Sequence, residues 1–169
     1  MSVADRFIFF IGGGLDSLSP YVIHVEYFDT ITETFHLAPW LNTPRSGHSS
    51  CTLGNTIYTF CGQNKRGHLS SVERLRVHPK RTRNGNEIEQ LIFPPGTASA
   101  AWELIELVGD DFVARAHVLA APINGNQIAI LGGMNSFNSY LGNGYLFDTV
   151  SKTVERVFED DFMFATRNN

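Results

Sequence analysis

The sequence predicts an all-β fold in which four-stranded antiparallel sheets repeat along one region of chain. Three observations predict it. Apolar runs end in three similar doublets, Gly12-Gly13, Cys61-Gly62 and Gly132-Gly133. Two-residue turn signals of the II′ and I′ kinds stand at Gly54-Asn55 and Asn124-Gly125. A composition with 12% aromatic residues, 13 Phe and 15 Gly is typical of short aromatic strands separated by glycine turns.

The two turns predict the register of two hairpins. Counting outward from the first turn places His48 opposite Cys61, and counting from the second places His117 opposite Gly132. Because both counts set a histidine opposite the first residue of a doublet, we expect His48 and His117 to share one position of the repeat. Pro122 falls inside the strand before the second turn, so its missing N–H is expected to face away from the ladder.

Each repeat is predicted to contain four short strands, named a to d in chain order. Strand b ends in the doublet, and strand d holds a bulky residue that is expected to fill space between neighbouring sheets. This bulky residue is Phe35, Trp102 and Val154 in the three repeats. The positions assigned a structural role in the repeat are Gly12, Gly13, Arg45, His48, Gly62, Trp102, Arg115, His117, Gly132 and Gly133.

The whole chain, residues 1–169, is predicted to be a single repeat region. An insert over residues 79–98 separates strands c and d of the second repeat and is expected to be a surface excursion. The predicted repeats cover about residues 6–43, 44–112 and 113–160, and residues 161–169 are the start of a further strand or a tail.

A repeat of about 50 residues with a double glycine, a following aromatic–Asp pair and a tryptophan resembles the kelch repeat. The resemblance covers nearly the whole chain. Cys61 replaces the first glycine of one doublet, and Phe35 and Val154 replace tryptophan. The matching residues are Gly12-Gly13, Tyr27, Asp29 and Phe35 in the first repeat, Arg45, His48, Tyr58, Cys61-Gly62 and Trp102 in the second, and Arg115, His117, Gly132-Gly133, Tyr145 and Asp148 in the third.

This resemblance implies a kelch-type β-propeller, in which four-stranded blades stack radially around a channel. It also implies a non-enzymatic scaffold that binds other proteins through loops on one propeller face. Substrate-recognition subunits of ubiquitin ligases and cytoskeletal or assembly adaptors use kelch propellers in this way.

The predicted strands run b-c-d, a-b-c-d and a-b-c-d, so the first repeat is expected to lack strand a. Arg167 stands where another strand a is expected to begin. Closed propellers have about four to eight blades, so an incomplete ring is expected. Three interpretations stay open: a fragment of a longer chain, a propeller completed by another chain or a second copy, and an open stack held in a larger assembly.

The loops between strands b and c are expected to emerge on one face, over residues 15–21, 63–71 and 134–142. The second is polar and basic, and the third mixes amides, hydroxyls and two aromatic rings, which suits adaptable recognition of a protein. The expected partner is another protein, including the rest of its own propeller or a second copy. The candidate partner-binding residues are Asn64, Lys65, Arg66, His68, Asn135, Phe137, Asn138 and Tyr140.

No catalytic residue, metal site or cofactor is predicted. The six His and two Cys show no H-x-x-H or C-x-x-C spacing. Gly12–Gly14 lacks a following Gly-Lys-Ser/Thr and is expected to form a turn, and Asp110-Asp111 and Asp160-Asp161 are expected to carry solvated loop charge. The alternative is a kelch-like enzyme or carbohydrate-binding module similar to galactose oxidase, which needs a convergent His/Tyr/Cys or carboxylate cluster.

The net charge and the cysteine content limit the class of binding partner and the cellular compartment that we expect. A formal net charge of -4 argues against nucleic acid. A membrane is not expected either, because no apolar run reaches the roughly 20 residues that span a bilayer, and the first residues do not resemble a signal peptide. The predicted register sets Cys51 opposite Tyr58, too far from Cys61 for a disulfide. Both cysteines are expected to be buried free thiols. A disulfide-stapled secreted domain would have more than two cysteines, so we expect a reducing compartment, the cytoplasm.

Overall fold

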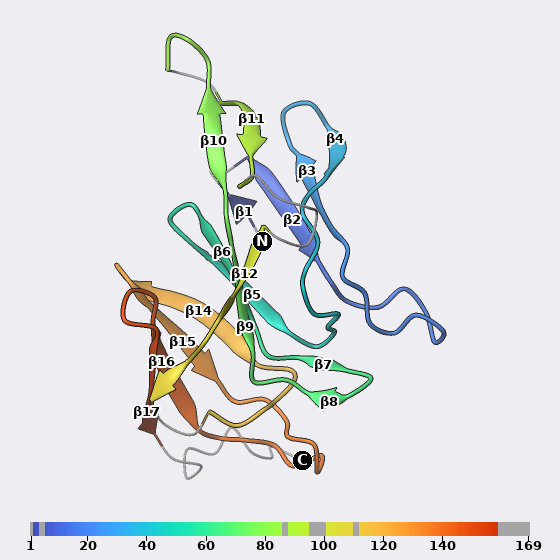
Figure 1. The fold of residues 1–169 in the computed structure, drawn as a ribbon, viewed down its shortest axis with the longest axis vertical. Helices are drawn as coiled ribbons and strands as arrows, with labels where there is room; N and C mark the ends of the chain where they lie inside the picture. Colours follow the sequence, from blue (N-terminus) through green and yellow to red (C-terminus); the bar gives the residue numbers. More distant parts are fainter. Residues whose placement is uncertain (1, 4–5, 86–87, 95–100, 110–111, 159–169) are drawn as a thin grey trace, which may run out of the picture.

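The computed structural model describes residues 2–3, 6–85, 88–94, 101–109 and 112–158. In these ranges the regular secondary structure consists of β-strands alone, which confirms the predicted all-β class. Three sheets, each built on four antiparallel strands, follow one another along the chain, and none closes on itself (Figure 1). This is the arrangement predicted for part of a propeller.

Each of these sheets is one blade, and its strands are hydrogen-bonded in chain order. Blade 1 contains β1 (Ser2–Val3), β2 (Phe7–Ile11), β3 (Val25–Asp29) and β4 (Thr34–Leu37). Blade 2 contains β5 (Ser49–Leu53), β6 (Thr56–Phe60), β9 (Val72–Arg76) and β12 (Trp102–Ile105). Blade 3 contains β14 (Leu119–Asn124), β15 (Gln127–Leu131), β16 (Gly144–Asp148) and β17 (Thr153–Phe158), with β13 (Val108–Gly109) added in parallel beside β17.

The prediction that the first repeat lacks strand a is wrong. The two-residue strand β1 lies antiparallel to β2, with Ser2 opposite Ile8 and Val3 opposite Phe7. A bare edge of β2 would leave backbone donors and acceptors unpaired. The short β1 occupies that edge and satisfies part of it.

The insert of the second repeat forms a hairpin of β10 (His78–Arg81) and β11 (Ile88–Ile92). It projects away from blade 2 toward the end of blade 1 where β3 turns into β4 (Figure 1). Leu91 is buried in the core shared with blade 1, and the Phe93 ring lies 6.1 Å from the Tyr27 ring, centroid to centroid. The insert is therefore more than a surface excursion, because its apolar side covers part of blade 1.

Two hydrophobic cores join the blades. The first packs Phe9 and Tyr27 of blade 1 against Leu75 and Trp102 of blade 2, and the Trp102 indole N–H donates a 2.8 Å hydrogen bond to the Pro39 carbonyl. The second lies between blades 2 and 3 and includes Tyr58, Phe60, Ile105, Ile130, Phe147 and Val154. The expectation that strand d fills the space between sheets is thus confirmed for Trp102 and Val154.

Phe35 does not follow the other two strand-d residues. Its side chain is 62% exposed on β4, whereas Trp102 and Val154 are buried. The expectation was wrong for the first repeat, because the described part of the chain puts no blade against that side of blade 1.

All three doublets have the same backbone conformation. The first residues, Gly12, Cys61 and Gly132, have φ of +55°, +62° and +63°, and the second residues, Gly13, Gly62 and Gly133, have φ of +97°, +92° and +104°. At two of the second positions space is also short, because a Cβ on Gly62 would lie 2.7 Å from the Ser46 carbonyl oxygen and one on Gly133 would lie 2.8 Å from the Ala116 carbonyl oxygen. At these two positions only glycine combines this φ with this clearance.

The predicted register is confirmed in one hairpin and wrong in the other. In β5–β6, Cys51 lies opposite Tyr58, and Gly54 has the positive φ of a II′ turn. In β14–β15 the pairing shifts between Pro122 and Asn124, so the turn moves one residue on, to Gly125-Asn126. Pro122 lies on β14, an edge strand of its sheet, where a residue without an N–H is tolerated.

The shift overturns the expectation that His48 and His117 share a repeat position. Leu119 pairs with Leu131, so Val118 takes the place opposite Gly132 that the count had given to His117. His117 has φ +58° and corresponds to Gly47, whose φ is +59°.

Candidate binding face

The three b–c loops lie on one side of the molecule, with the middle loop between the other two (Figure 1). The first runs from Gly12 to His24, between β2 and β3. The second contains the small hairpin of β7 (Gln63–Asn64) and β8 (Gly67–His68), and the third covers residues 132–143. A partner that approaches this side therefore meets all three loops.

Each loop is shaped by an Asp or Asn side chain. The side-chain oxygen accepts a hydrogen bond from the backbone N–H two residues later, which is the geometry of an Asx turn. The donor and acceptor residues are Leu18 and Asp16 at 2.8 Å, Arg66 and Asn64 at 2.8 Å, and Phe137 and Asn135 at 2.9 Å.

The residue that donates this bond presents its side chain at the tip of the loop. Leu18 is 87% exposed and Phe137 is 86% exposed, while Arg66 is the exposed tip of the middle loop. Tyr140, at 82% exposure, adds a second aromatic ring to the third loop. Large apolar side chains this exposed are typical of surfaces that bind other molecules.

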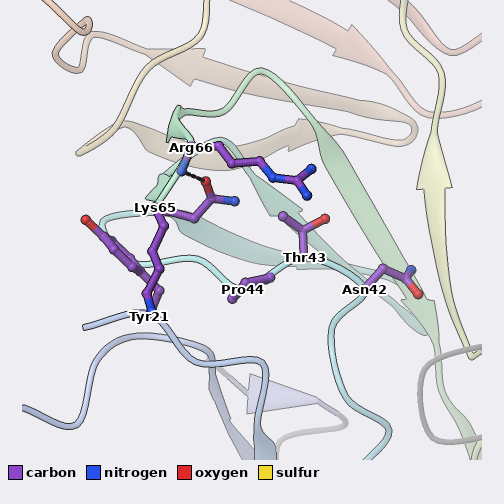
Figure 2. Close-up of a pocket in the computed structure, with 7 residues that line it drawn as sticks. Tyr21, Asn42, Thr43, Pro44, Lys65 and Arg66 are labelled. Atoms are coloured by element: carbon purple, nitrogen blue, oxygen red, sulfur yellow. Dashed lines mark hydrogen bonds between the residues drawn. The ribbon is translucent and has the colours of Figure 1, made fainter. Parts of the chain in front are cut away.

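A pocket of about 450 Å³ lies where the first two b–c loops meet the segment between blades 1 and 2. Figure 2 shows Lys65 running beside Tyr21 and Arg66 extending over Thr43, so the two cations lie on different sides of the pocket. The lining residues are Tyr21, Asn42, Thr43, Pro44, Asn64, Lys65 and Arg66.

A buried ion pair fixes the backbone of two residues that line the pocket. Arg45 and Glu73 are fully buried, and a guanidinium nitrogen lies 2.5 Å from a carboxylate oxygen. The Glu73 carboxylate also accepts hydrogen bonds from the backbone N–H groups of Asn42, at 2.8 Å, and Thr43, at 3.2 Å. The same pair that lies inside blade 2 therefore positions two residues of the pocket.

The sequence around this pocket matches a known family. A family model of the kelch motif matches residues 44–77. The chain carries a kelch repeat. Kelch-like protein 36 of Rattus norvegicus and Kelch-like protein 36 of Mus musculus are each 29% identical to it over 76 residues. The match covers 45% of this chain and spans 12% of the length of these relatives.

The buried arginine of the kelch repeat recurs in the next blade. Arg45 donates to the Cys61 carbonyl at 2.8 Å, and Arg115 donates to the Gly132 carbonyl at 3.0 Å. In both repeats the acceptor is the first residue of the doublet. The other side-chain partner differs: Glu73 accepts from Arg45, whereas Asn143, at the repeat position of Ser71, accepts from Arg115 at 2.7 Å.

Backbone hydrogen bonds between kelch blades start at the second residue of each doublet. The Gly13 N–H donates to the Arg45 carbonyl at 2.8 Å, and the Gly62 N–H donates to the Arg115 carbonyl at 2.9 Å. Arg45 and Arg115 thus each donate to their own blade from the side chain and accept from the preceding blade at the carbonyl. This explains why doublet and arginine recur in phase.

The candidate partner-binding residues of the kelch loops fall into two groups. Asn64, Lys65 and Arg66 line the pocket, whereas the four candidates of the third loop do not. Among these four, Phe137, Asn138 and Tyr140 are exposed and Asn135 shapes the loop. His68 is half-buried on β8, paired with Gln63.

Two residues of this face, Leu18 and Tyr21, were not among the predicted partner-binding residues. The signal for Leu18 was the preceding Asp16, two residues before it as Asn64 is before Arg66 and Asn135 before Phe137. Tyr21 lines the pocket from the first loop, and nothing local in the sequence indicates that.

The titratable groups of the kelch core are buried. Burial, helped by the charge of Arg45, lowers the pKa of His48 to about 4. Cys51 and Cys61 are free, and burial raises the pKa of each thiol to about 12. Within the described ranges, no three His, Cys, Asp or Glu residues gather where they would hold a metal ion, and no helix is long and apolar enough to cross a membrane.

One side of blade 1 exposes apolar residues at positions that the other blades bury. Ile8, Phe28 and Phe35 form one cross-strand row, flanked by the exposed Phe10 and Leu37. The equivalent rows are fully packed against the preceding blade. Their residues are Ile57, Leu75 and Trp102 in blade 2 and Ile128, Phe147 and Val154 in blade 3.

Proposed function

We propose that this chain is part of a non-enzymatic protein-binding propeller that engages its partner through the b–c loop face. The observation that carries the proposal is the exposure of Leu18, Phe137 and Tyr140 at the tips of loops that a packed scaffold holds in place. The kelch motif and the Kelch-like relatives support a protein-interaction family. Within that family, a substrate-recognition or assembly adaptor is the role we propose.

An enzymatic role is the competing proposal, and it has less support. A galactose-oxidase-like propeller needs His, Tyr, Cys or carboxylate side chains converging on one point, and no such group of His, Cys, Asp and Glu is found in the described ranges. Stoichiometric copper together with oxidase activity in the purified protein would contradict the scaffold proposal. The free buried thiols Cys51 and Cys61 support the cytoplasm as its compartment.

We also propose that the exposed side of blade 1 packs against another kelch blade. The row of Ile8, Phe28 and Phe35 repeats the pattern that blades 2 and 3 bury on a preceding blade. Another blade, from the same protein or a second copy, would cover it in the same way. Native mass spectrometry of the protein from cell extract tests this, because a strict monomer of this chain contradicts it.

The loop-face proposal is tested with two matched variants. Leu18→Ser with Phe137→Ser removes an apolar tip from two b–c loops. The control, Ile31→Ser with Val150→Ser, removes two apolar residues, 71% and 77% exposed, from the c–d turns, which lie at the opposite ends of the strands. Cross-linked complexes in cell extract should be lost in the first variant and kept in the control. Loss in the control alone would contradict the proposal.

A further inference from the structure

The pocket beside the β7–β8 hairpin has an unusual charge for this protein. Its lining contributes two cations, Lys65 and Arg66, and polar hydroxyl and amide groups, but no carboxylate. The chain as a whole carries a formal net charge of -4. A positive pocket on an acidic protein attracts anions locally while the rest of the surface repels them.

Lys65 and Arg66 are free to pair with an external anion. Neither side chain forms an ion pair with any residue in the described ranges, whereas Arg6, Arg45 and Arg74 each hold a carboxylate at 2.5 to 2.8 Å. A bound anion gains charge-assisted hydrogen bonds from these cations.

The scaffold holds the pocket in shape before any ligand arrives. The Asx turn at Asn64 sets the backbone from which Arg66 extends, and β7 is pinned to the start of blade 2 by the pairing of Gln63 with Ser46. On the other side, Glu73 holds the backbone of Asn42 and Thr43. Little conformational freedom is lost from the backbone of such a pocket when it binds, which favours affinity.

We propose that this pocket receives an anionic side chain of the partner protein, a carboxylate or a phosphate, between Lys65 and Arg66. The proposal rests on the protein-binding function proposed above. Tyr21 and Thr43, which also line the pocket, carry hydroxyl groups for the remaining oxygens of the anion, whereas the Asn42 amide nitrogen donates to the Trp102 carbonyl at 2.6 Å. Leu18 is exposed on the first loop and Phe137 on the third, and the middle loop that carries Lys65 and Arg66 lies between these two loops (Figure 1). We therefore expect the partner to present apolar residues as well as the acidic or phosphorylated one.

Fluorescence anisotropy with defined peptides tests the proposal. The probes are fluorescein-labelled peptides of four glutamates, four phosphoserines, four glutamines and four lysines. Wild-type protein is expected to bind the glutamate or the phosphoserine peptide at least about tenfold more tightly than the glutamine peptide, and less tightly as salt is added. Which of the two anionic peptides binds more tightly identifies the anion as carboxylate or phosphate.

Charge reversal separates the pocket from general electrostatics. Lys65→Glu with Arg66→Glu should lose the anionic peptide at least about tenfold and gain the lysine peptide. The control, Lys80→Glu with Arg81→Glu, changes the net charge equally but lies on the β10–β11 hairpin, and should keep wild-type binding. Gain of the lysine peptide also shows that the reversed variant is folded.

Two results overturn the proposal: no binding of either anionic peptide, or equal loss in the pocket variant and in the control. Both leave the loop-face function to its own test with the Leu18 and Phe137 variants. Cross-linked complexes that depend on those loop tips, with no anionic peptide bound, would keep the protein-binding function and reject the anion pocket.

Discussion

Removing the guanidinium of Arg45 is expected to lower the free energy of unfolding by about 3–5 kcal/mol, as for other broken buried ion pairs. In Arg45→Met the Glu73 carboxylate stays fully buried and keeps only the backbone donors of Asn42 and Thr43. It loses its counter-charge, and the Cys61 carbonyl loses a 2.8 Å hydrogen bond. The cost comes mainly from leaving one charge uncompensated in a medium of low dielectric constant.

A double-mutant cycle measures this coupling. Arg45→Met and Glu73→Gln should each destabilise the chain, and the double variant should lose at least about 2 kcal/mol less than the sum, because neither charge is then left alone. Urea unfolding followed by the fluorescence of the two tryptophans, Trp40 and the buried Trp102, is the assay. Since small domains are stable by about 5–15 kcal/mol, each single variant should shift the midpoint clearly.

The control for that cycle is the surface pair of Arg74 and Glu103. Its nitrogen and oxygen atoms lie 2.8 Å apart, but the Glu103 side chain is 48% exposed. Arg74→Met is expected to cost less than about 1 kcal/mol, because water screens the remaining carboxylate. A loss below about 1 kcal/mol in Arg45→Met, or strict additivity in its cycle, would refute the reasoning from burial.

Three further predictions concern the repeat. Gly62→Ala should destabilise the chain more than Gly67→Ala in urea unfolding: both have positive φ, but only at Gly62 would the added methyl group meet the backbone. Below pH 6.5 stability should fall toward pH 4, because unfolded His48 binds a proton that the folded state, with its pKa of about 4, excludes; His48→Gln should flatten this slope. Cys51 and Cys61 should resist a thiol reagent in the native state and react after unfolding, since burial raises both pKa values to about 12; rapid native labelling would contradict this.

The turn residues predicted the register of the first hairpin correctly because no bulge interrupts its two strands. Gly54-Asn55 satisfies a II′ turn with one positive φ, and both strands continue from it without interruption. In the second hairpin the strand pairing shifts between Pro122 and Asn124, so the turn lies one residue after the position that Asn124-Gly125 predicted. A bulge of this kind depends on how the strand packs, so the turn residues alone do not reveal it.

The set of residues that line the pocket could not be predicted from the sequence, for a different reason. Lys65 and Arg66 were identified as candidates from their loop, but Tyr21 and Asn42 come from other segments of chain. Glu73 does not line the pocket at all: it lies on β9 and fixes the pocket by accepting hydrogen bonds from the backbone N–H groups of Asn42 and Thr43. Sets of residues assembled from distant segments become visible only when the packing of the blades is known.

The same packing explains why scaffold and recognition are separable in this chain. The residues that recur in phase, such as Arg45, Gly62 and Trp102, are engaged inside blades or between them. The residues that differ most between equivalent loop tips, Leu18 and Arg66, share only a backbone turn. Because the turn requires an Asp or Asn two residues earlier and nothing of the tip itself, the tip side chain is free to match the partner while the blade keeps its structure.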